Sequence, residues 1–423
     1  MEAGLGWLSR QFDLDQRVSL DLGGFFHTFL PPVGLYYATN VLAILGPKTF
    51  IYRLALLPIT FLVAYRTAVS LDIARGFLPA APDKLAYMNQ ALVLAMFTVL
   101  TRTLSRTFSS QVPQRIRGTT PQHTRRQIAL DAADLTFNLR GVGWNFSAVN
   151  KLKLPPYTRP LAPTSAFLIP TFFSLVAHII MADFMQYACQ LFGPNTVGST
   201  AGGSIYDMTT NPSIRYLRST TLTLLVGLII YGAIQIGHDA FSIIAVTLLG
   251  QSPAEWPPIF QSPWLSTSLT EFWAIRWHQV FRQDFLDVGA RPVYLVAGRA
   301  GGVLGAFLVS GTLHYVGLWA MGTGSDIRVV LFFLTMGVGV ILEGLWRHFV
   351  GKRVGGWRGW IWTGVWLLAF GPLMVDPWCR SGIMGSVFIP QAARPSILLH
   401  SLVTDILRSA KTYWIEYMYI DRE

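Results

Sequence analysis

The stretch SLTEFWAIRWHQVFRQDF, residues 268–285, is the densest run of polar and aromatic side chains in an otherwise apolar sequence. Ser268 is followed three residues later by Glu271, the pattern of a capping box, in which hydroxyl and carboxylate accept hydrogen bonds from the first free N–H groups of a helix. Neither Gly nor Pro interrupts the stretch. The pattern therefore predicts one continuous helix over residues 268–285.

This predicted helix has two distinct faces. Trp273, Trp277 and Phe281 recur every four residues and form an aromatic stripe. The second face carries Glu271, Ile275, His278 and Arg282. Two interpretations follow from the residues alone. The helix lies at a membrane surface with a solvated imidazole, or it presents that imidazole, flanked by a carboxylate and a guanidinium, to a substrate.

The composition excludes an ordinary soluble domain. Hydrophobic residues are 52% and charged residues 13% of the chain, with a mean hydropathy of +0.42, whereas roughly a quarter of residues are charged in soluble proteins. Runs long enough to cross a bilayer lie at about Leu30–Leu45, Leu54–Val69, Tyr87–Leu104, Ala166–Met185, Thr220–Leu249, Val293–Met321, Val329–Phe349 and Ile361–Val375. We therefore expect an all-α polytopic membrane protein with eight to ten spans in one domain, residues 1–423. The run 220–249 is long enough for one tilted helix or two short ones, and residues 378–423 are expected to form an interfacial segment that covers the bundle.

The net charge of +11 does not indicate a nucleic-acid partner, because the basic residues lie mostly in connections between apolar runs. The longest connection, residues 102–159, has ten basic and two acidic residues, so the positive-inside rule predicts that it is cytosolic. Cys189 and Cys379 are too few for a disulfide framework, and no metal-ligand spacing is present. We expect no metal.

Three segments carry a family resemblance. SLTEFWAIRWHQVFR resembles the signature of the wax synthase-like membrane-bound O-acyltransferases, and NLRGVGWNF, residues 138–146, resembles the Arg-Gly-x-Gly-Trp box of their fungal branch. SGTLHYVG, residues 310–317, is similar to the family's segment around an intramembrane histidine. EWPPIF, residues 255–260, resembles the lead-in that precedes the family signature. The resemblance implies a multi-helix bundle enclosing a catalytic tunnel.

His314 lies inside an apolar run rich in glycine. An ionisable side chain at membrane depth is a functional candidate, and burial keeps an imidazole neutral and able to accept a proton. Ser310, four residues earlier, shares its helical face and can orient the ring. From the residues alone, a core histidine bonded to a neighbouring helix is equally allowed. The resemblance implies that His314 is the catalytic base.

His278 matches the family's second catalytic position, occupied by Asn or His. The resemblance implies that this residue positions the thioester or donates to its developing oxyanion, and a histidine here favours the fungal acetyltransferase branch.

The remaining candidate site residues fall into two groups. The predicted contacts to acyl-CoA are Arg140, Trp144, Asn145, Trp273, Arg276, Trp277 and Arg282. An alternative for the 138–146 box is an Arg and a Trp that hold a helix end at the interface. His238, Asp239 and Ser310 are the predicted substrate contacts, with pairing to another helix as the alternative for His238–Asp239. Glu343, with Arg347 four residues on, is interpreted as structural.

The predicted function is acetyl transfer from acetyl-CoA to a hydroxyl of a lipophilic secondary metabolite such as a terpenoid. The predicted location is the endoplasmic reticulum membrane, in contact with membrane lipid and with the CoA side cytosolic. Three alternatives remain: a long-chain wax ester synthase, a membrane terpene cyclase that uses Asp239 or Glu343 as its acid, and a transporter lined by His238, Asp239 and His314. The acyl length, the acceptor and the oligomeric state are not determined by the sequence.

Overall fold

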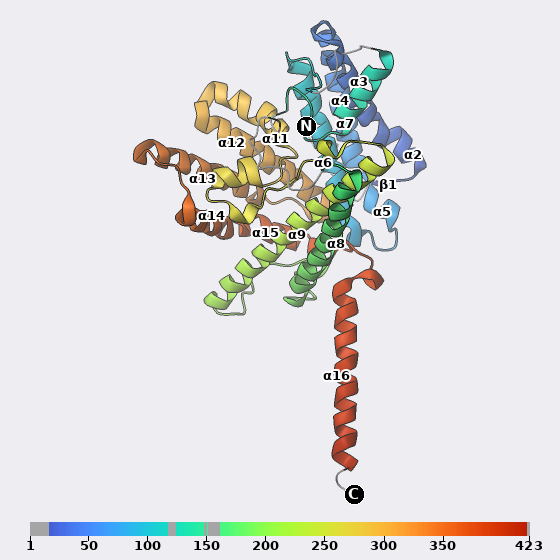
Figure 1. Ribbon diagram of the computed structural model, residues 1–423, viewed down its shortest axis with the longest axis vertical. Helices are drawn as coiled ribbons and strands as arrows, with labels where there is room; N and C mark the ends of the chain where they lie inside the picture. The colour runs from blue at the N-terminus through green and yellow to red at the C-terminus, as the bar shows by residue number, and fades with distance from the viewer. Residues whose placement is uncertain (1–16, 117–123, 148–149, 151–160, 421–423) are drawn as a thin grey trace, which may run out of the picture.

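The computed structural model describes residues 17–116, 124–147, 150 and 161–420 (Figure 1). Its two short strands, β1 (Val18–Ser19) and β2 (Leu71–Asp72), pair in parallel. The α-helices are α2 (Leu22–Gly24), α3 (Leu30–Leu45), α4 (Phe50–Ser70), α5 (Ile73–Phe77), α6 (Ala86–Phe108), α7 (Arg125–Phe137), α8 (Thr164–Leu191), α9 (Pro212–Leu248), α10 (Leu269–Glu271), α11 (Arg282–Asp284), α12 (Arg291–Leu318), α13 (Arg328–Val350), α14 (Gly356–Phe370), α15 (Pro372–Arg380) and α16 (Pro395–Ile420). The described part of the chain also has π-helical turns at Phe25–Phe29, Phe272–Arg276, Phe285–Ala290 and Trp319–Thr323. The predicted all-α class is confirmed.

Seven helical stretches among the described residues are long and apolar enough to cross a membrane. They are Leu22–Leu45, Pro47–Ser70, Pro82–Phe108, Thr164–Leu191, Pro212–Leu248, Arg282–Gly322 and Arg328–Val350. Six of them each contain one of the first seven predicted runs, and Pro212–Leu248 contains all but the last residue of the remaining run, 220–249. The eighth run, 361–375, is divided at Gly371 between α14 and α15, so the described part of the chain has seven candidate spans where eight to ten were expected. The chain is a multi-pass membrane protein.

The long run 220–249 forms one helix. Asn211 caps α9 by accepting a hydrogen bond from the backbone N–H of Ile214 at 3.0 Å, and Pro212 occupies the first helical position, as helix starts favour. The helix then continues for 37 residues to Leu248. It lies beside α8 (Figure 1).

Glycines bring α12 close to its neighbours. A Cβ on Gly311 would lie 3.0 Å from the Cα of Val330 in α13, and one on Gly305 would lie 2.5 Å from the carbonyl oxygen of Gly289. The helix also kinks at Gly298, where φ is +62°. Because Gly311 has no side chain, Val330 and Phe333 of α13 pack directly against α12 at this point.

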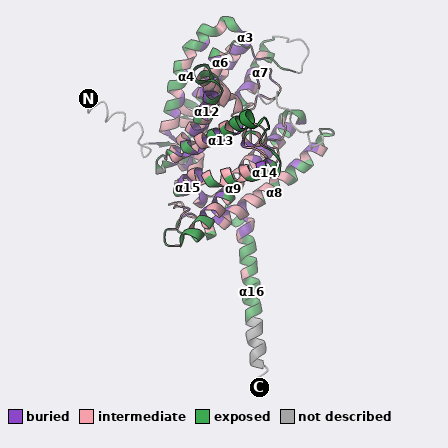
Figure 2. Ribbon diagram, turned by 90° about the vertical axis from the view of Figure 1, so that its left-hand side faces the viewer, coloured by how far each residue is buried: buried purple, intermediate pink, exposed green. Residues whose placement is uncertain are grey.

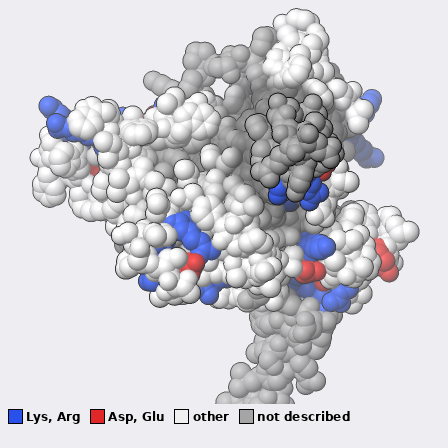
Figure 3. Space-filling view, turned by 90° about the horizontal axis from the view of Figure 1, so that it is seen from below, with Lys and Arg blue, Asp and Glu red and all other residues white. Residues whose placement is uncertain are grey.

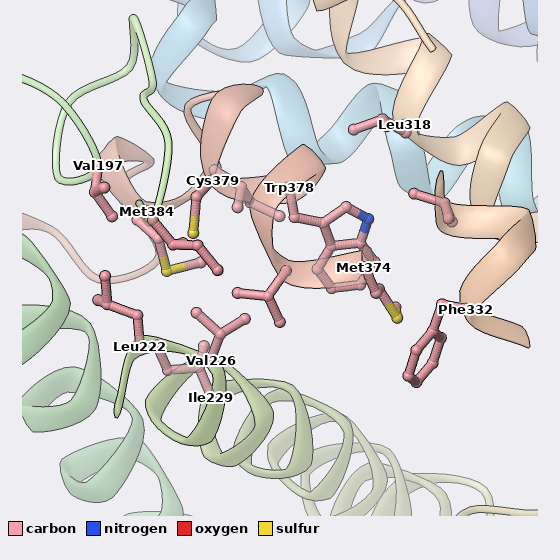
Figure 4. Packing of buried hydrophobic residues seen from close by; sticks show 14 of the residues in the cluster. Val197, Leu222, Val226, Ile229, Leu318, Phe332, Met374, Trp378, Cys379 and Met384 are labelled. Atoms are coloured by element: carbon pink, nitrogen blue, oxygen red, sulfur yellow. The ribbon is translucent and has the colours of Figure 1, made fainter. Parts of the chain in front are cut away.

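The largest buried cluster joins α9, α12, α13 and α15. Figure 4 shows Leu222, Val226 and Ile229 of α9 facing the side chains of Met374 and Trp378 from α15. A second cluster packs α3, α4 and α6 around Tyr36 and Met96, each about 2% exposed. The first cluster packs α15 against α9 and α13, and Leu318 of α12 also belongs to it.

The outer surface is apolar and weakly charged. Leu295 and Val296 are 84% and 90% exposed, and the face in Figure 3 has only small separate groups of basic and acidic residues on an uncharged surface. Exposed apolar side chains at this density on long helices are expected where the surface faces lipid.

The C-terminal segment differs from the expected interfacial cover. The helix predicted there exists as α16, but it projects away from the bundle and is exposed along most of its described length (Figures 1 and 2). It contacts the bundle at its start, where Asp183 of α8 accepts hydrogen bonds from the Arg394 side chain at 2.5 Å and from the Ser396 N–H at 2.7 Å. The prediction that this segment covers the bundle is therefore wrong.

Candidate active site

Residues 268–285 begin as a capped helix, as predicted. The Ser268 hydroxyl accepts a hydrogen bond from the Glu271 N–H at 3.0 Å. The Glu271 carboxylate accepts from the backbone N–H and the hydroxyl of Thr267, at 2.8 and 2.9 Å. The serine half of the capping box is therefore confirmed, while the glutamate half bonds one residue further back than the pattern predicts.

The helix does not continue to Phe285, and this part of the prediction is wrong. After the π-helical turn Phe272–Arg276 the backbone becomes extended at Trp277, with ψ 155°, and helix resumes only at Arg282. Long side chains take the carbonyl groups that a helix would have used. The Gln279 amide donates to the Trp273 and Trp277 carbonyls at 3.0 and 2.6 Å, and Arg282 donates to the carbonyl of Ala274.

This break changes which residues lie together. Trp273, Trp277 and Phe281 do not form one helical stripe, and His278 lies in an irregular segment rather than on a helix face with Glu271. The sequence offers no Gly or Pro at the break. The residues that could have indicated the break are Gln279 and Arg282, whose long side chains can donate hydrogen bonds to backbone carbonyls. In addition, π-helical turns tend to occur at functional sites.

Glu343 of α13 fixes the start of the segment. Its buried carboxylate accepts hydrogen bonds from the backbone N–H groups of Leu269 at 2.6 Å and Thr270 at 2.9 Å. It also accepts from the Thr270 hydroxyl at 2.6 Å and from the Trp362 indole N–H at 3.0 Å. The structural interpretation of Glu343 is correct, but its bonding partners here are these groups rather than Arg347. Sequence reasoning missed this contact because its residues are more than seventy positions apart along the chain.

His278 is a half-buried ring in an aromatic setting. Its centroid lies 5.7 Å from that of Trp277 and 6.0 Å from that of Phe260, and its Nδ1 is buried with no hydrogen-bond partner among the described residues. Burial, with smaller contributions from a charge on His314 and from Arg140, lowers the pKa of His278 from its ordinary 6.5 to about 3. The ring is therefore neutral at pH 7.

His314 has a defined orientation on α12. Its Nδ1 lies 2.8 Å from the backbone carbonyl oxygen of Ser310. A carbonyl oxygen only accepts, so Nδ1 carries the proton and Nε2 carries the lone pair. Ser310 thus orients the ring as predicted, through its carbonyl rather than its hydroxyl. The imidazole also lies against Phe333, with ring centroids 4.5 Å apart, and Trp378, at 6.2 Å.

The two histidines lie near each other. A charge on His314 acts to lower the pKa of His278, so the two rings are within electrostatic reach. Aromatic contacts connect the segments that carry them, because Trp273 lies 6.2 Å from both Trp277 and Phe333 between ring centroids. His278 and His314, which are 36 positions apart in the sequence, are thereby connected through aromatic side chains of residues 268–285 and of α13.

The box 138–146 forms the tight turn that its glycines predict, with φ +61° at Gly141 and +84° at Gly143. The Arg140 guanidinium donates to the carbonyls of Pro257 and Pro258 at 2.6 and 3.0 Å. The box is therefore bonded to the lead-in 255–260, so two of the sequence boxes lie side by side.

The other predicted CoA contacts in this box point into the protein. Trp144 is 1% exposed and its indole N–H donates to Asp134 at 2.6 Å. The Asn145 amide donates to the Val112 carbonyl at 3.0 Å and its oxygen accepts from the Gln114 N–H at 3.1 Å. These contacts fit the alternative in which the box fixes local structure.

The arginines of the signature segment likewise bond to neighbouring protein groups. Arg276 pairs with Glu271 at 2.6 Å and donates to the Gln261 carbonyl at 2.8 Å. Arg282 donates to the Gln279 side-chain oxygen at 2.8 Å. These bonds close the irregular loop around His278, so a structural role accounts for both side chains.

His238 and Asp239 lie buried on α9. Asp239 accepts from the Ser174 hydroxyl of α8 at 2.6 Å and from the Gln235 amide at 3.0 Å. The His238 ring lies 5.6 Å from that of Trp256. The contact with α8 matches the interhelical alternative. Among the described residues, no group of three or more His, Cys, Asp or Glu side chains is placed to hold a metal ion.

The neutral His278 predicts a loss of stability in acid. The unfolded chain binds a proton at His278 below pH 6.5, whereas the folded chain binds it only near pH 3, so the free energy of unfolding falls as the pH drops through this window. The free energy of unfolding falls by about 1.4 kcal/mol per pH unit in this window. Because the ring is partly exposed, we expect a smaller loss, about 1–2 kcal/mol at pH 5. We expect His278→Asn to show a smaller fall in melting temperature between pH 7.5 and 5.0 than the unaltered protein. An identical fall in both would contradict the assignment.

Comparison with other proteins locates this site in a shared region. Residues 256–335, which contain both histidines, match the family described as Membrane bound O-acyl transferase family. The chain is 30% identical to acetyltransferase spyB of Aspergillus fumigatus over 175 residues, 34% of this chain and 30% of that protein. It is 23% identical to O-Mevalon transferase yanI of Aspergillus niger over 337 residues, 68% of this chain and 72% of that protein. It is 32% identical over 142 residues to probable long-chain-alcohol O-fatty-acyltransferase 7 of Arabidopsis thaliana, 31% of this chain and 40% of that protein. The aligned part thus spans under a third of spyB and nearly three quarters of yanI.

Proposed function

Because the chain belongs to the membrane-bound O-acyltransferase family, we propose that it transfers an acetyl group from acetyl-CoA to a hydroxyl of a lipophilic secondary metabolite. The observation that carries the proposal is the orientation of His314. Its Nδ1–H is held by the Ser310 carbonyl, so Nε2 is left as a proton acceptor within electrostatic reach of a second, neutral histidine.

In the proposed reaction His314 is the general base. Its Nε2 takes the proton of the acceptor hydroxyl as the oxygen attacks the thioester carbonyl carbon. The tetrahedral intermediate then collapses, the C–S bond breaks, and CoA leaves as a thiolate that recovers the proton from the imidazolium. The Ser310 carbonyl stabilises the protonated ring, because it accepts the Nδ1–H in both charge states.

His278 is proposed to stabilise the oxyanion. A neutral imidazole carries one N–H, which donates to the thioester oxygen as negative charge develops there. A ring that stays neutral down to about pH 3 does not compete with His314 for the substrate proton. The rings of Trp277 and Phe260, with centroids 5.7 and 6.0 Å away, limit the water that reaches it.

Two features support a short acyl donor. Relatives from fungi bear the name acetyltransferase, and the His314 ring is flanked by the bulky side chains of Phe333 and Trp378, which leave less width for a long chain. We further propose a hydroxylated terpenoid as acceptor and the endoplasmic reticulum as location. The basic connection 102–159 would face the cytosol, where acyl-CoA is available.

A second candidate is long-chain wax ester synthesis, which the Arabidopsis relative's name favours. The cyclase alternative receives less support. The carboxylates of Asp239 and Glu343 both accept hydrogen bonds from protein donors, whereas a protonating acid must present its own O–H to the substrate.

The test is CoA release by purified protein in lipid nanodiscs. Acetyl-CoA and palmitoyl-CoA would each be supplied with hydroxylated terpenoids or long-chain alcohols. We expect release with acetyl-CoA that depends on a terpenoid acceptor, with the acetyl ester detected by mass spectrometry. Release with palmitoyl-CoA and fatty alcohols alone would establish the second candidate instead. Chemical change of a terpenoid without any CoA donor would overturn both.

A further inference from the structure

A cleft with an arginine-rich lining opens between the end of α6, the box 138–146 and α11. Its lining includes Arg102, Arg106, Arg140, Phe146 and Asp284. The empty space between the lining residues, open solvent at the mouth included, is about 300 Å³. Three guanidinium groups against one carboxylate among these side chains make the lining positive.

Two of these arginines form hydrogen bonds that hold the lining segments of the cleft together. Arg102 pairs with Asp284 at 3.0 Å, with 8% and 5% of their side chains exposed, and also donates to the Leu139 carbonyl. Arg140 donates to the carbonyls of the lead-in at 2.6 and 3.0 Å. These bonds connect α6, the box and α11, so the cleft is held by contacts between three separate parts of the chain.

Arg106 differs from both. It is 9% exposed, and no described residue forms a hydrogen bond or ion pair with its guanidinium. Its guanidinium lies over the Phe146 ring, with 3.7 Å from Cζ to the ring centroid. The carboxylates of Asp284 and Asp287 are within electrostatic reach, but they bond to Arg102 and to Ser105 and Arg291. A cation–π contact stabilises the charge but accepts none of the five N–H donors in the plane of the group. None of the Arg106 nitrogens is among the fully buried polar atoms without a partner, so these donors reach the open cleft, where an anion can accept their hydrogens.

The turn of the 138–146 box holds the ring beneath this guanidinium. A Cβ on Gly141 would lie 3.0 Å from Cε2 of Phe146 and 3.3 Å from the Cβ of Ser147, and the φ of +61° is one that glycine adopts without strain. The glycine of this box therefore shapes the cleft as well as the turn.

The cleft adjoins the reacting centre. Gln283 and Asp284 of its lining follow His278 by five and six residues. The charge of Arg140, also in the lining, is near enough to lower the pKa of His278. An anion held in the cleft would thus lie on the His278 side of the site.

We propose that Arg106 binds a phosphate group of the acyl donor in this cleft, where it positions the CoA portion while the thioester extends toward His278. The inference rests on the proposed function for the identity of the donor. The planar fork of a guanidinium matches two phosphate oxygens. The phosphate of a membrane lipid has the same chemistry, so the experiment separates the two sources.

The experiment measures binding, not turnover. Calorimetry on the purified full chain would compare CoA, 3′-dephospho-CoA and pantetheine, which has no phosphate. We expect Arg106→Gln to weaken CoA about 10–100-fold, from the loss of charge-assisted hydrogen bonds, and to leave pantetheine unchanged. Arg106→Lys keeps the positive charge but lacks the planar guanidinium, so its affinity for CoA should lie between those of the unaltered protein and Arg106→Gln. Arg66→Gln, which alters an exposed arginine near the end of α4, is the matched control.

The other outcomes are equally decisive. Unchanged CoA affinity in Arg106→Gln, or equal weakening of CoA and pantetheine, would overturn the proposal. Retained CoA binding with reduced binding of phosphatidic acid in phosphatidylcholine nanodiscs would assign the cleft to a lipid and overturn its assignment to the donor. If Arg106→Gln does not fold, the lysine variant carries the same comparison, because it must weaken CoA but not pantetheine. Specific CoA binding without acyl transfer to any acceptor would contradict the proposed function but would still support the phosphate site at Arg106.

Discussion

Replacing His314 by alanine is expected to reduce acceptor-dependent CoA release by about 10²–10⁴-fold, the range for loss of a general base. The imidazole Nε2 is the proton acceptor that the Ser310 carbonyl orients, and alanine offers nothing in its place. The measurement is the initial rate at varied acetyl-CoA and saturating acceptor, which gives kcat and the KM for acetyl-CoA. Because the base acts in the chemical step, kcat should fall far more than the KM for acetyl-CoA rises.

A matched control distinguishes this loss from general damage. His348→Ala removes an exposed imidazole near the end of α13 and should retain the full rate. Calorimetric CoA binding should persist in His314→Ala, which verifies that the site is still formed. A His314→Ala protein that turns over at the unaltered rate would remove this residue from the chemistry.

Replacing Glu343 by alanine is expected to have the largest effect on stability. It leaves the N–H groups of Leu269 and Thr270 and the indole N–H of Trp362 without their acceptor. At about 1–3 kcal/mol for each buried unsatisfied group, and because the exposed Thr270 regains water, we expect a loss of about 3–5 kcal/mol. The melting temperature should fall, and so should kcat, since the segment that carries His278 starts at these bonds.

A second substitution tests the same contact from the other side. Trp362→Phe removes one donor, so in the Glu343→Gln background it should cost less than it does alone, and the double-mutant cycle measures that coupling. Glu255→Gln alters an exposed carboxylate and is the control. An unchanged melting temperature in Glu343→Ala would show that water or other groups replace the carboxylate.

The helices were predictable where local pattern determines them. The run that became α9 is apolar and begins after an Asn-Pro start signal, and the hydrogen bond from His314 to Ser310 follows from four-residue spacing on one helix. The division between α14 and α15 also had a local signal, the Gly371–Pro372 pair, since proline favours a helix start.

The rest depends on contacts between distant residues. The break at Trp277 is stabilised by side chains whose hydrogen bonds to backbone carbonyls replace those of a helix. The helix propensities of the residues contain no information about such long-range or side-chain hydrogen bonds. Arg140 has the residue type of a phosphate ligand, yet it bonds to the carbonyls of Pro257 and Pro258. Arg106 looked like one basic residue of a topology signal, and only the fold places it in a cleft beside Phe146.

The length of α9 has a consequence for the membrane around the protein. Its residues 220–248 extend about 43 Å at 1.5 Å per residue, against roughly 30 Å of hydrocarbon. This hydrophobic mismatch requires a steep inclination of the helix or a locally thickened bilayer. Since Asp239 bonds α9 to Ser174 of α8 at 2.6 Å, the two helices must respond together. We therefore expect bilayer thickness to act on α8 and α9 together, and membranes rich in longer acyl chains to accommodate α9 with less inclination.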